Sequence, residues 1–528
     1  MKKVILIITI LIVIINSNSQ VTQEWLARYS VGYYSTVSCI GTDPSGNVFI
    51  GGSTANDYLT VKYNSSGIQQ WAVTYNGPPG YGDYIYALAI DISGNVYVTG
   101  TSNGGYPSPN DDYTTIKYNS SGVQQWLVRY NGIANDRDNA LAICLDASGN
   151  IYVTGWSYVT TAAGMTDYAT VKYNSTGVQQ WATRYNGTGN NSDYANAICT
   201  DNNGYIYVTG ASNSSSNYNS TDYATIKYNT SGGQQWVSRY NGAANLRDEA
   251  IAIAVDNLGN VYVTGGSQAS SSNTDILTIK YNSSGGILWS QRFDGGYDNP
   301  GGLRLDNAGN VYISGTSNSK YVTIKYNTTG AQQWIMYYNG PMNQGSQVTD
   351  MVVDANGNTY VTGSSDGEYA TVKYNTSGVQ QWVMRFDEPR PNMNASGFAI
   401  ALDSTSNIIV SGISQQESLT DIGTIKYSQL VGILPVSNEI PQQYSLTQNY
   451  PNPFNPTTTI KFQIPTGGFV KLIIFDVLGR EVSTLVNEEL KPGKYEASWE
   501  ASAYSSGIYY YKLISIDYTE TKKMILIK

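Results

Sequence analysis

The chain has 528 residues, of which only 13% are charged, and its formal net charge is −9. It contains no histidine, which excludes His-based catalytic triads and His metal ligands, and it contains no basic run of the kind that nucleic acid or an anionic membrane attracts. Its three cysteines, Cys39, Cys144 and Cys199, are too few for a disulfide framework, and we interpret them as small packing residues.

The first predicted element is a secretory signal peptide at residues 1–19. Lys2 and Lys3 precede an apolar run over residues 4–15, and small residues before Gln20 suit cleavage. The run is too short to span a bilayer comfortably, so we expect a mature chain without a transmembrane anchor.

Three phrases then recur eight times between residues 20 and 428: QQWxxRYN around a tryptophan, the turn-and-strand phrase DxxGNVYVTG, and the strand phrase TIKYN. The tryptophans are Trp25, Trp71, Trp126, Trp181, Trp236, Trp289, Trp334 and Trp382. The aspartates of the turn are Asp43, Asp91, Asp146, Asp201, Asp256, Asp306, Asp354 and Asp403. A β-type repeat of about 45 to 55 residues is typical of a propeller or a solenoid.

One repeat, residues 83–131, shows what each copy encodes. Its alternating apolar residues and turn signals predict four antiparallel strands, at residues 87–90, 96–99, 114–118 and 124–130. Asp91 and Gly94 mark the first turn, because Asp accepts backbone N–H groups and Gly adopts positive φ. Each copy is therefore predicted to form one four-stranded sheet.

The two ends of the repeat array are complementary. The strand around Trp25 precedes every first strand, whereas the last copy has strands at 398–402, 407–411 and 422–427 but no fourth strand. The N-terminal strand can complete the last sheet, which would leave no open edge. The predicted fold is all-β, an eight-bladed β-propeller closed by the N-terminal strand, with an open solenoid as the alternative.

The phrases DxxGNVYVTG, TIKYN and SSGxQQW resemble the bacterial β-propeller repeat family whose members are often called seven-bladed propeller repeats. The resemblance covers about residues 20 to 428 and implies the fold rather than an activity. This chain differs from the family name in offering eight sets.

Variable loops between the second and third strands are the expected recognition surface, because loops on a rigid scaffold tolerate change. The long ones cover residues 101–111, 156–167 and 211–222. Four aromatic residues in them lie outside the repeat pattern and are predicted to contact a glycan or protein ligand: Trp156, Tyr158, Tyr106 and Tyr218. The alternative is that these rings pack against their own loops.

The positions of the aspartates favour structural roles in loops over catalytic or metal-binding roles. Five aspartates precede first strands and are interpreted as loop caps: Asp83, Asp138, Asp193, Asp248 and Asp298. A Ca²⁺ held by them is the alternative, but three repeats lack the residue, so no metal site and no cofactor is assigned. No catalytic residue is assigned either, and we do not expect an enzyme. Two alternatives stay open: a polysaccharide-active glycosidase or lyase that uses Asp111 and Asp167, and a purely structural surface protein.

Composition changes after the last repeat. Residues 429–444 are interpreted as a linker, and residues 445–528 as a small Ig-like β-sandwich of short alternating strands. Four motifs stand out: NYPNPFNP, the turn DVLGREV, the phrase SSGIY, and a basic-apolar last strand. Their defining residues are Asn449, Pro451, Pro453, Phe454, Asp476, Gly479, Arg480, Gly507, Lys522 and Lys523.

These motifs closely resemble the C-terminal sorting domain of type IX secretion substrates. The resemblance implies the type IX secretion machinery as a partner, and a protein that is secreted or held on the outer cell surface after signal-peptide cleavage.

Overall fold

The computed structural model describes residues 21–30, 35–78, 82–103, 110–160, 165–214, 220–271, 273–386, 394–416, 419–429, 434–437, 441–490, 492–501 and 504–527. The chain divides into two compact units, one spanning Gln23–Tyr427 and the other formed mainly by Ser428–Lys528. We call them the repeat domain and the C-terminal module.

The repeat domain contains eight four-stranded antiparallel sheets among its described residues. Seven of them are consecutive in the chain: β2(Ser35–Thr42), β3(Val48–Thr54), β4(Asp57–Tyr63), β5(Gln69–Tyr75); β6(Tyr84–Ile90), β7(Val96–Asn103), β8(Asp111–Tyr118), β9(Gln124–Tyr130); β10(Asp138–Leu145), β11(Ile151–Tyr158), β12(Thr166–Tyr173), β13(Gln179–Tyr185); β14(Asp193–Thr200), β15(Ile206–Asn213), β16(Thr221–Tyr228), β17(Gln234–Tyr240); β18(Asp248–Val255), β19(Val261–Ser270), β20(Asn273–Tyr281), β21(Ile287–Phe293); β22(Asp298–Leu305), β23(Val311–Ser317), β24(Lys320–Tyr326), β25(Gln332–Tyr338); and β26(Ser346–Val353), β27(Thr359–Ser365), β28(Glu368–Tyr374), β29(Gln380–Phe386).

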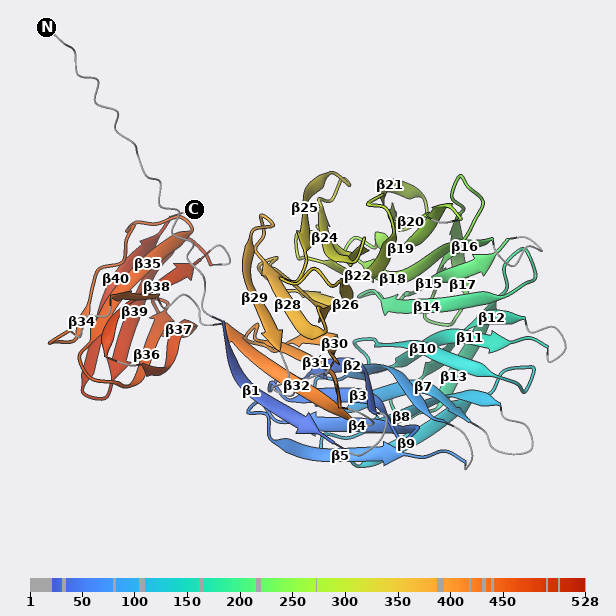
Figure 1. Cartoon of the computed structure of the whole chain (residues 1–528), viewed down its shortest axis with the longest axis horizontal. Coiled ribbons are helices and arrows are strands. Elements are labelled where there is room, and N and C mark those ends of the chain that lie inside the picture. The colour runs from blue at the N-terminus through green and yellow to red at the C-terminus, as the bar shows by residue number, and fades with distance from the viewer. Residues whose placement is uncertain are drawn as a thin grey trace, which may run out of the picture. The chain divides into compact units, whose positions relative to one another are not determined.

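The eighth sheet joins the two ends of the repeat array. It consists of β1(Val21–Tyr29), β32(Leu419–Gln429), β31(Ile408–Gln416) and β30(Asn394–Leu402), in that order. Figure 1 shows blue β1 beside orange β32. The carboxylate of Glu24 lies 3.3 Å from Lys426 Nζ, and the hydroxyls of Thr22 and Ser428 are 2.9 Å apart. The N-terminal strand therefore supplies the fourth strand that the last repeat lacks.

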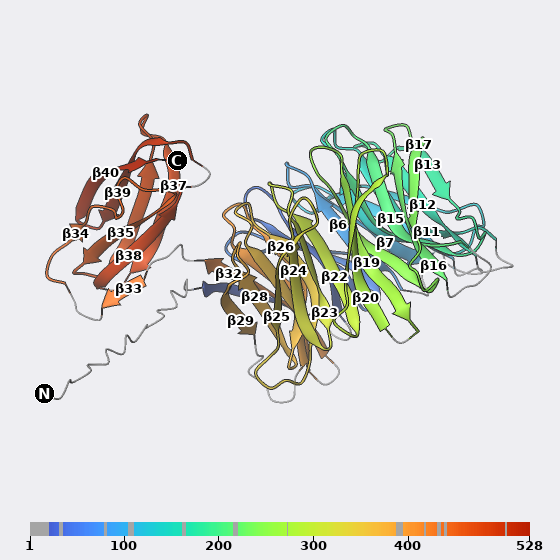
Figure 2. The same ribbon diagram turned by 90° about the horizontal axis from the view of Figure 1, so that it is seen from above.

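Neighbouring sheets meet through their first strands. These contact one another in the cyclic order β2, β6, β10, β14, β18, β22, β26, β30 and again β2, in a propeller-like arrangement (Figures 1 and 2). Thr42 Oγ1, on β2, donates to Leu402 O, on β30, at 2.7 Å. The apolar cluster at this junction joins Ala27 and Ile409 of one sheet to Val37 and Val61 of the next.

Buried tyrosines tie each sheet to the following one. Tyr113 OH donates to Ala169 O at 3.1 Å, and the equivalent bond recurs from Tyr58, Tyr168, Tyr223, Tyr321 and Tyr369. A tyrosine suits this position because its ring fills apolar space while its hydroxyl satisfies a backbone carbonyl. The high tyrosine content is thus largely a property of the sheet interfaces.

The repeated turns follow the expected chemistry. Asp91 Oδ1 accepts N–H bonds from Ser93 and Asn95 at 2.9 and 3.0 Å, and Gly94 has φ +73°. Asp91 Oδ2 accepts from Asn95 Nδ2 at 2.7 Å and from Tyr97 OH at 3.1 Å. The hydrogen bonds confirm that the turn aspartates cap their own turns.

The C-terminal module consists of two further four-stranded sheets among the described residues, one ordered β33-β38-β35-β34 and one ordered β37-β36-β39-β40 (Figure 2). Their strands are β33(Leu434–Ser437), β34(Ser445–Leu446), β35(Thr457–Ile464), β36(Gly468–Phe475), β37(Glu481–Leu490), β38(Gly493–Glu500), β39(Gly507–Ser515) and β40(Tyr518–Leu526). One buried cluster, which includes Phe454, Ile474, Trp499 and Leu513, lies between the sheets.

Two local expectations differ from the structure. The segment interpreted as a linker, 429–444, contains β33, which pairs with β38 and so belongs to the module. Trp156 and Tyr158, expected in a loop, end strand β11, where Trp156 pairs with Tyr168 and Tyr158 with Thr166. The second and third strands of this sheet remain paired past the repeat phrase, which shortens the loop.

Candidate ligand-binding site

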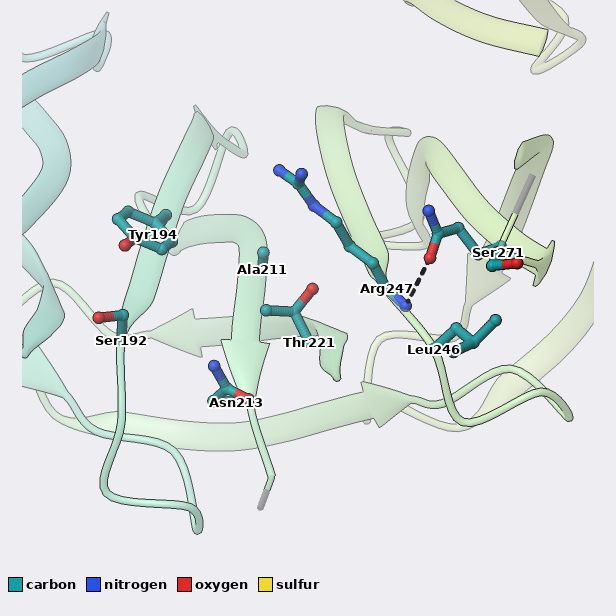
Figure 3. Close-up of a pocket in the computed structure, with 9 residues that line it drawn as sticks. Ser192, Tyr194, Ala211, Asn213, Thr221, Leu246, Arg247 and Ser271 are labelled. Atoms are coloured by element: carbon teal, nitrogen blue, oxygen red, sulfur yellow. Dashed lines mark hydrogen bonds between the residues drawn. The ribbon is translucent and has the colours of Figure 1, made fainter. Parts of the chain in front are cut away.

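The rim that carries the variable loops also carries the loops between each fourth strand and the next first strand. Between sheets β14–β17 and β18–β21, this rim contains a pocket of about 690 Å³. The residues that line it are Ser192, Tyr194, Ala211, Asn213, Thr221, Leu246, Arg247, Gln268 and Ser271. Figure 3 shows Tyr194 and Arg247 on opposite sides of the space.

Tyr194 is held on one wall by the start of β14. It pairs with Ala211 across the ladder, next to Asp193, whose side chain is buried. Asp193 accepts N–H bonds from Gly187 and Asn213 at 2.7 and 2.9 Å, and burial raises the pKa of this carboxyl to about 6. The bonds fix the loop and the strand that flank the pocket.

The other wall is built from Arg247 and Gln268. The backbone N–H of Gln268 donates to Arg247 O at 3.0 Å, and the side chain of Gln268 accepts from Arg247 N at 3.2 Å. The Arg247 guanidinium is 61% exposed and pairs with Glu249, which also accepts from Asn196 Nδ2 at 3.1 Å. The exposed Arg247 guanidinium and the carboxamides of Gln268 and Asn213 suit a ligand with many hydroxyl groups.

Arg247 and Gln268 also line a second, smaller pocket of about 310 Å³ toward sheet β22–β25. Its walls include Thr274, Tyr297 and Asn299. Tyr297 is 68% exposed, so the two pockets together have an accessible aromatic ring at each end. A row of two pockets that share a polar partition fits an extended ligand better than a compact one.

Neither Trp156 nor Tyr158 lines the pocket, but Trp156 contacts Tyr194, which does. Trp156 packs edge-on against Tyr158, with ring centroids 5.9 Å apart, and against Tyr194, with centroids 6.1 Å apart. All three rings are half-buried, so Trp156 supports Tyr194 from behind. Tyr106 and Tyr218 lie outside the described residues.

The carboxylates of the enzymatic alternative lie on different sheets. Asp111, on β8, accepts from Asn103 Nδ2 at 2.7 Å, and Asp167, on β12, lies 3.3 Å from Arg184 Nε. Asp167 is buried, and burial raises its pKa while the Arg184 guanidinium lowers it. An ion-paired, buried carboxylate is a poor general acid or base for an exposed substrate.

The sequence pattern does not identify three of the pocket residues as site residues: Tyr194, Arg247 and Gln268. Tyr194 occupies the slot after a capping aspartate, where other repeats carry Tyr84, Asn139, Glu249 and Asn299. This variability inside an otherwise constant phrase was the available signal. The pocket itself depends on two sheets coming together, which the repeat pattern does not specify residue by residue.

The motif residues of the C-terminal module mainly hold its two ends together. Asn449 is buried and donates to Pro451 O at 3.1 Å and Thr458 Oγ1 at 2.9 Å. Phe454 exchanges backbone bonds of 3.0 Å with Ile525 and Ile527, beside the last strand. Pro451 and Pro453 follow cis peptide bonds in the same segment.

The remaining motif residues form a turn and an edge. Asp476 caps the β36–β37 turn, where Gly479 has φ +75°, and binds Arg480 Nε at 2.7 Å. Gly507 opens β39, and Lys522 and Lys523 lie on the edge strand β40, where Lys522 pairs with Glu520 at 3.1 Å.

Comparison with known families agrees with both halves of this architecture. A family model described as "Beta-propeller repeat" matches residues 73–107, 180–219 and 235–270. A model described as "Secretion system C-terminal sorting domain" matches residues 448–528. The chain carries beta-propeller repeats and a type IX sorting domain. Such a domain implies export by the type IX secretion system, to the cell surface or beyond.

No curated protein sequence matches the chain. Among solved structures, PorZ, an essential bacterial surface component of the type-IX secretion system of Porphyromonas gingivalis, is 14% identical, with a TM-score of 0.34 and coverage of 93% of this chain and 70% of that one. A putative 6-phosphogluconolactonase from Bacteroides uniformis is 11% identical, with a TM-score of 0.40 and coverage of 68% and 98%. Likeness at this level carries no functional argument for the propeller.

The described part of the chain holds no helix with the length and apolarity that crossing a membrane requires.

Proposed function

We propose that the chain is a binding protein of the cell surface or the extracellular space, and that its propeller binds an oligosaccharide in the pocket between Tyr194 and Arg247. In this proposal the eight sheets are the blades of one closed propeller, and the C-terminal module is an Ig-like sandwich. Residues 1–19 direct passage through the inner membrane, and the sorting domain directs passage through the outer one.

The observation that carries the proposal is the composition of the pocket. Tyr194 offers an aromatic face for a sugar ring, and Asn213, Thr221, Arg247 and Gln268 offer polar groups around it. Aromatic surface with a few positioned polar groups is what sugar-sized ligands require. Thr221 already donates to Asp248 O at 3.1 Å, which fixes its position without blocking its acceptor lone pairs.

An enzymatic role has weaker support. Asp167 is occupied by Arg184, and the pocket residues that we propose for binding include no carboxylate. A purely structural role remains the main competitor, and it predicts no ligand at all.

A glycan array probed with the purified chain tests the proposal, and the strongest hit is then quantified by isothermal titration calorimetry. Tyr194→Ala and Arg247→Ala should each weaken binding about tenfold, because a stacked ring or a charge-assisted hydrogen bond contributes about 1–2 kcal/mol.

The repeat supplies matched controls. Tyr84 and Arg137 occupy the same repeat slots as Tyr194 and Arg247, on other sheets. Tyr84→Ala and Arg137→Ala should leave the affinity unchanged. A blank array, or equal losses in the two pairs of variants, would contradict the assignment of the pocket.

A further inference from the structure

We propose that Asp275, Asp294 and Asp298 form a Ca²⁺ site on the rim between sheets β18–β21 and β22–β25. This site is separate from the proposed glycan site and does not depend on it. One oxygen from each of the three carboxylates lies within 4.8 Å of the others.

Two of the three carboxylates belong to a pair that recurs around the propeller. At five successive junctions, an aspartate at the start of the third strand lies close to the capping aspartate of the next sheet. Burial raises the pKa of one carboxyl in each pair, and the charge of the other carboxyl raises it further. The pairs are Asp57/Asp83, Asp112/Asp138, Asp167/Asp193, Asp222/Asp248 and Asp275/Asp298. In four of these an arginine of the fourth strand neutralises one member only.

Asp294 makes the last of these junctions different. The same slot holds asparagine in five other copies, serine in the first (Ser30) and aspartate in the last (Asp387); the asparagines are Asn76, Asn131, Asn186, Asn241 and Asn339. The loop from Asp294 to Asp298 is also shorter than the loop from Asn241 to Asp248. The substitution and the shortening together place a third carboxylate beside a buried pair.

One oxygen of the cluster is buried without a hydrogen-bond partner among the described residues. Asp275 and Asp298 are each 1% exposed, and Oδ1 of Asp275 has no partner there. The other carboxylate oxygen of Asp275 accepts from Arg292 Nη1 at 2.7 Å, and Asp298 accepts from Gly295 N at 2.8 Å and from the side chain of Ser317. Leaving Asp275 Oδ1 unsatisfied is costly, and a cation bound to it would remove the cost.

Asp294 closes the site from the solvent side. Its Oδ1 accepts from Gly296 N at 3.3 Å and from Asn273 Nδ2 at 3.4 Å, which orients the carboxylate on its short loop. Three carboxylates and the Arg292 guanidinium give a net charge of about −2, which a divalent ion balances.

The donor set selects Ca²⁺ among divalent ions. All donors are hard carboxylate oxygens, and the exposed Asp294 leaves room for the waters that complete six to eight ligands. Mg²⁺ demands a stricter octahedron. A site with three protein carboxylates and several waters should have a dissociation constant of about 0.1–1 mM, as extracellular calcium modules do.

Titration of the chelator-treated chain with CaCl₂ by isothermal calorimetry tests the proposal. We expect one Ca²⁺ per chain at submillimolar affinity, and binding of MgCl₂ at least tenfold weaker. Asp294→Asn restores the residue that other repeats carry, so it preserves the fold, and it should weaken Ca²⁺ binding at least tenfold.

Asp136→Asn is the matched control, because Asp136 is a loop carboxylate two residues before Asp138 of the buried Asp112/Asp138 pair. It should leave Ca²⁺ affinity unchanged. No heat of binding up to 10 mM CaCl₂ would overturn the site, as would equal effects of Asp294→Asn and Asp136→Asn. Equal affinity for Mg²⁺ would overturn the choice of ion. Circular dichroism of each variant separates loss of the ligand from loss of the fold.

Discussion

At the scale of single residues, aspartates of the propeller occupy two opposite electrostatic environments. Burial pushes the pKa of Asp91 up, but hydrogen bonds from Asn95, Ser93 and Tyr97 outweigh it, so the pKa is lowered. Burial raises the pKa of Asp193 to about 6, because its hydrogen bonds from Gly187, Ser212 and Asn213 do not compensate. The turn aspartate stabilises the fold as an anion, whereas the strand-start aspartate favours the proton.

Asp193→Asn should therefore reduce the loss of stability between pH 5 and pH 7.5. A carboxyl whose folded pKa of about 6 exceeds the unfolded value of 3.8 contributes stability below 3.8 that is lost as the pH rises through 6. Asparagine keeps an acceptor for only one of the Gly187 and Asn213 amides, which bind different oxygens of Asp193, so the variant is less stable at both pH values, but it carries no charge. Urea unfolding at the two pH values should show a pH-dependent change smaller by about 1–2 kcal/mol in the variant.

Asp91→Asn provides the contrast, because its sign is opposite. The lowered pKa of Asp91 gives stability that is present at neutral pH and is lost as the pH falls through its folded pKa. This variant should be weaker than the wild type at pH 7.5, by about 1 kcal/mol, and the gap should close in acid. The same pH response in both variants would contradict the assignment of the two environments.

At the scale of strands and turns, a tryptophan of one sheet contacts a turn glycine of the next sheet at seven of the junctions between described sheets. Trp126 Nε1, on β9, donates to Ser175 O in the β12–β13 turn at 3.2 Å, and a Cβ added to Gly177 in the same turn would lie 2.8 Å from the Trp126 ring. The sheet closed by β1 lacks this turn, because its third and fourth strands come from opposite ends of the chain. Correspondingly, the buried Trp382 Nε1 has no hydrogen-bond partner in the part of the chain that the structure describes.

Trp126 belongs to the fourth strand of its sheet, and Ser175 and Gly177 belong to the turn between the third and fourth strands of the following sheet. The contact therefore joins sheet β6–β9 to sheet β10–β13. The same pairing of an indole with the next sheet's turn glycine recurs at Trp25/Gly67, Trp71/Gly122, Trp181/Gly232, Trp236/Gly285, Trp289/Gly330 and Trp334/Gly378.

Gly177→Ala should destabilise the propeller more than Gly149→Ala, although both glycines are in turns of sheet β10–β13. Gly177 has φ +83° and Gly149 has φ +76°, so alanine costs about 1 kcal/mol of backbone strain at either position. Only at Gly177 does the new Cβ meet the Trp126 ring; at Gly149 the nearest atom is Ser175 Cβ, at 3.9 Å. Urea unfolding should show an additional loss of about 1–3 kcal/mol for Gly177→Ala. Equal losses would show that the indole contact contributes nothing.

The sequence could predict the sheets because their causes are local. The turn aspartates, the turn glycines and the alternating strands lie within a few residues of one another. The local sequence of each repeat is therefore enough to predict its four-stranded sheet. Tyr194 and Arg247 could not be placed together, because the pocket joins residues of two sheets. The strand β33 was missed for a similar reason: residues 434–437 have a partner, β38, that lies about 60 residues further on.

At the scale of the whole molecule, the order of parts along the chain follows from how the propeller closes. Because β1 supplies the fourth strand of the eighth sheet, the chain leaves the repeat domain at the end of its third strand, β32, where the C-terminal unit begins at Ser428. The C-terminal module has its own buried core and its own two sheets, so nothing in its fold requires the propeller. The two units can therefore serve two separate roles, the ligand binding that we propose for the repeat domain and export by the C-terminal module.

Deletion of residues 434–528 should separate these roles. The cut is placed before β33, because that strand pairs with β38 and so belongs to the C-terminal module. The propeller keeps all eight sheets and every contact within Gln23–Tyr427, so its thermal unfolding midpoint should stay within about 2 °C of the full chain's propeller transition. Without the sorting domain the protein should accumulate in the periplasm, which cell fractionation and surface protease digestion measure. A reporter that carries the same leader and residues 434–528 is the control and should reach the surface. Normal surface display of the truncated chain would contradict the export role, and loss of its propeller transition would contradict the independence of the two units.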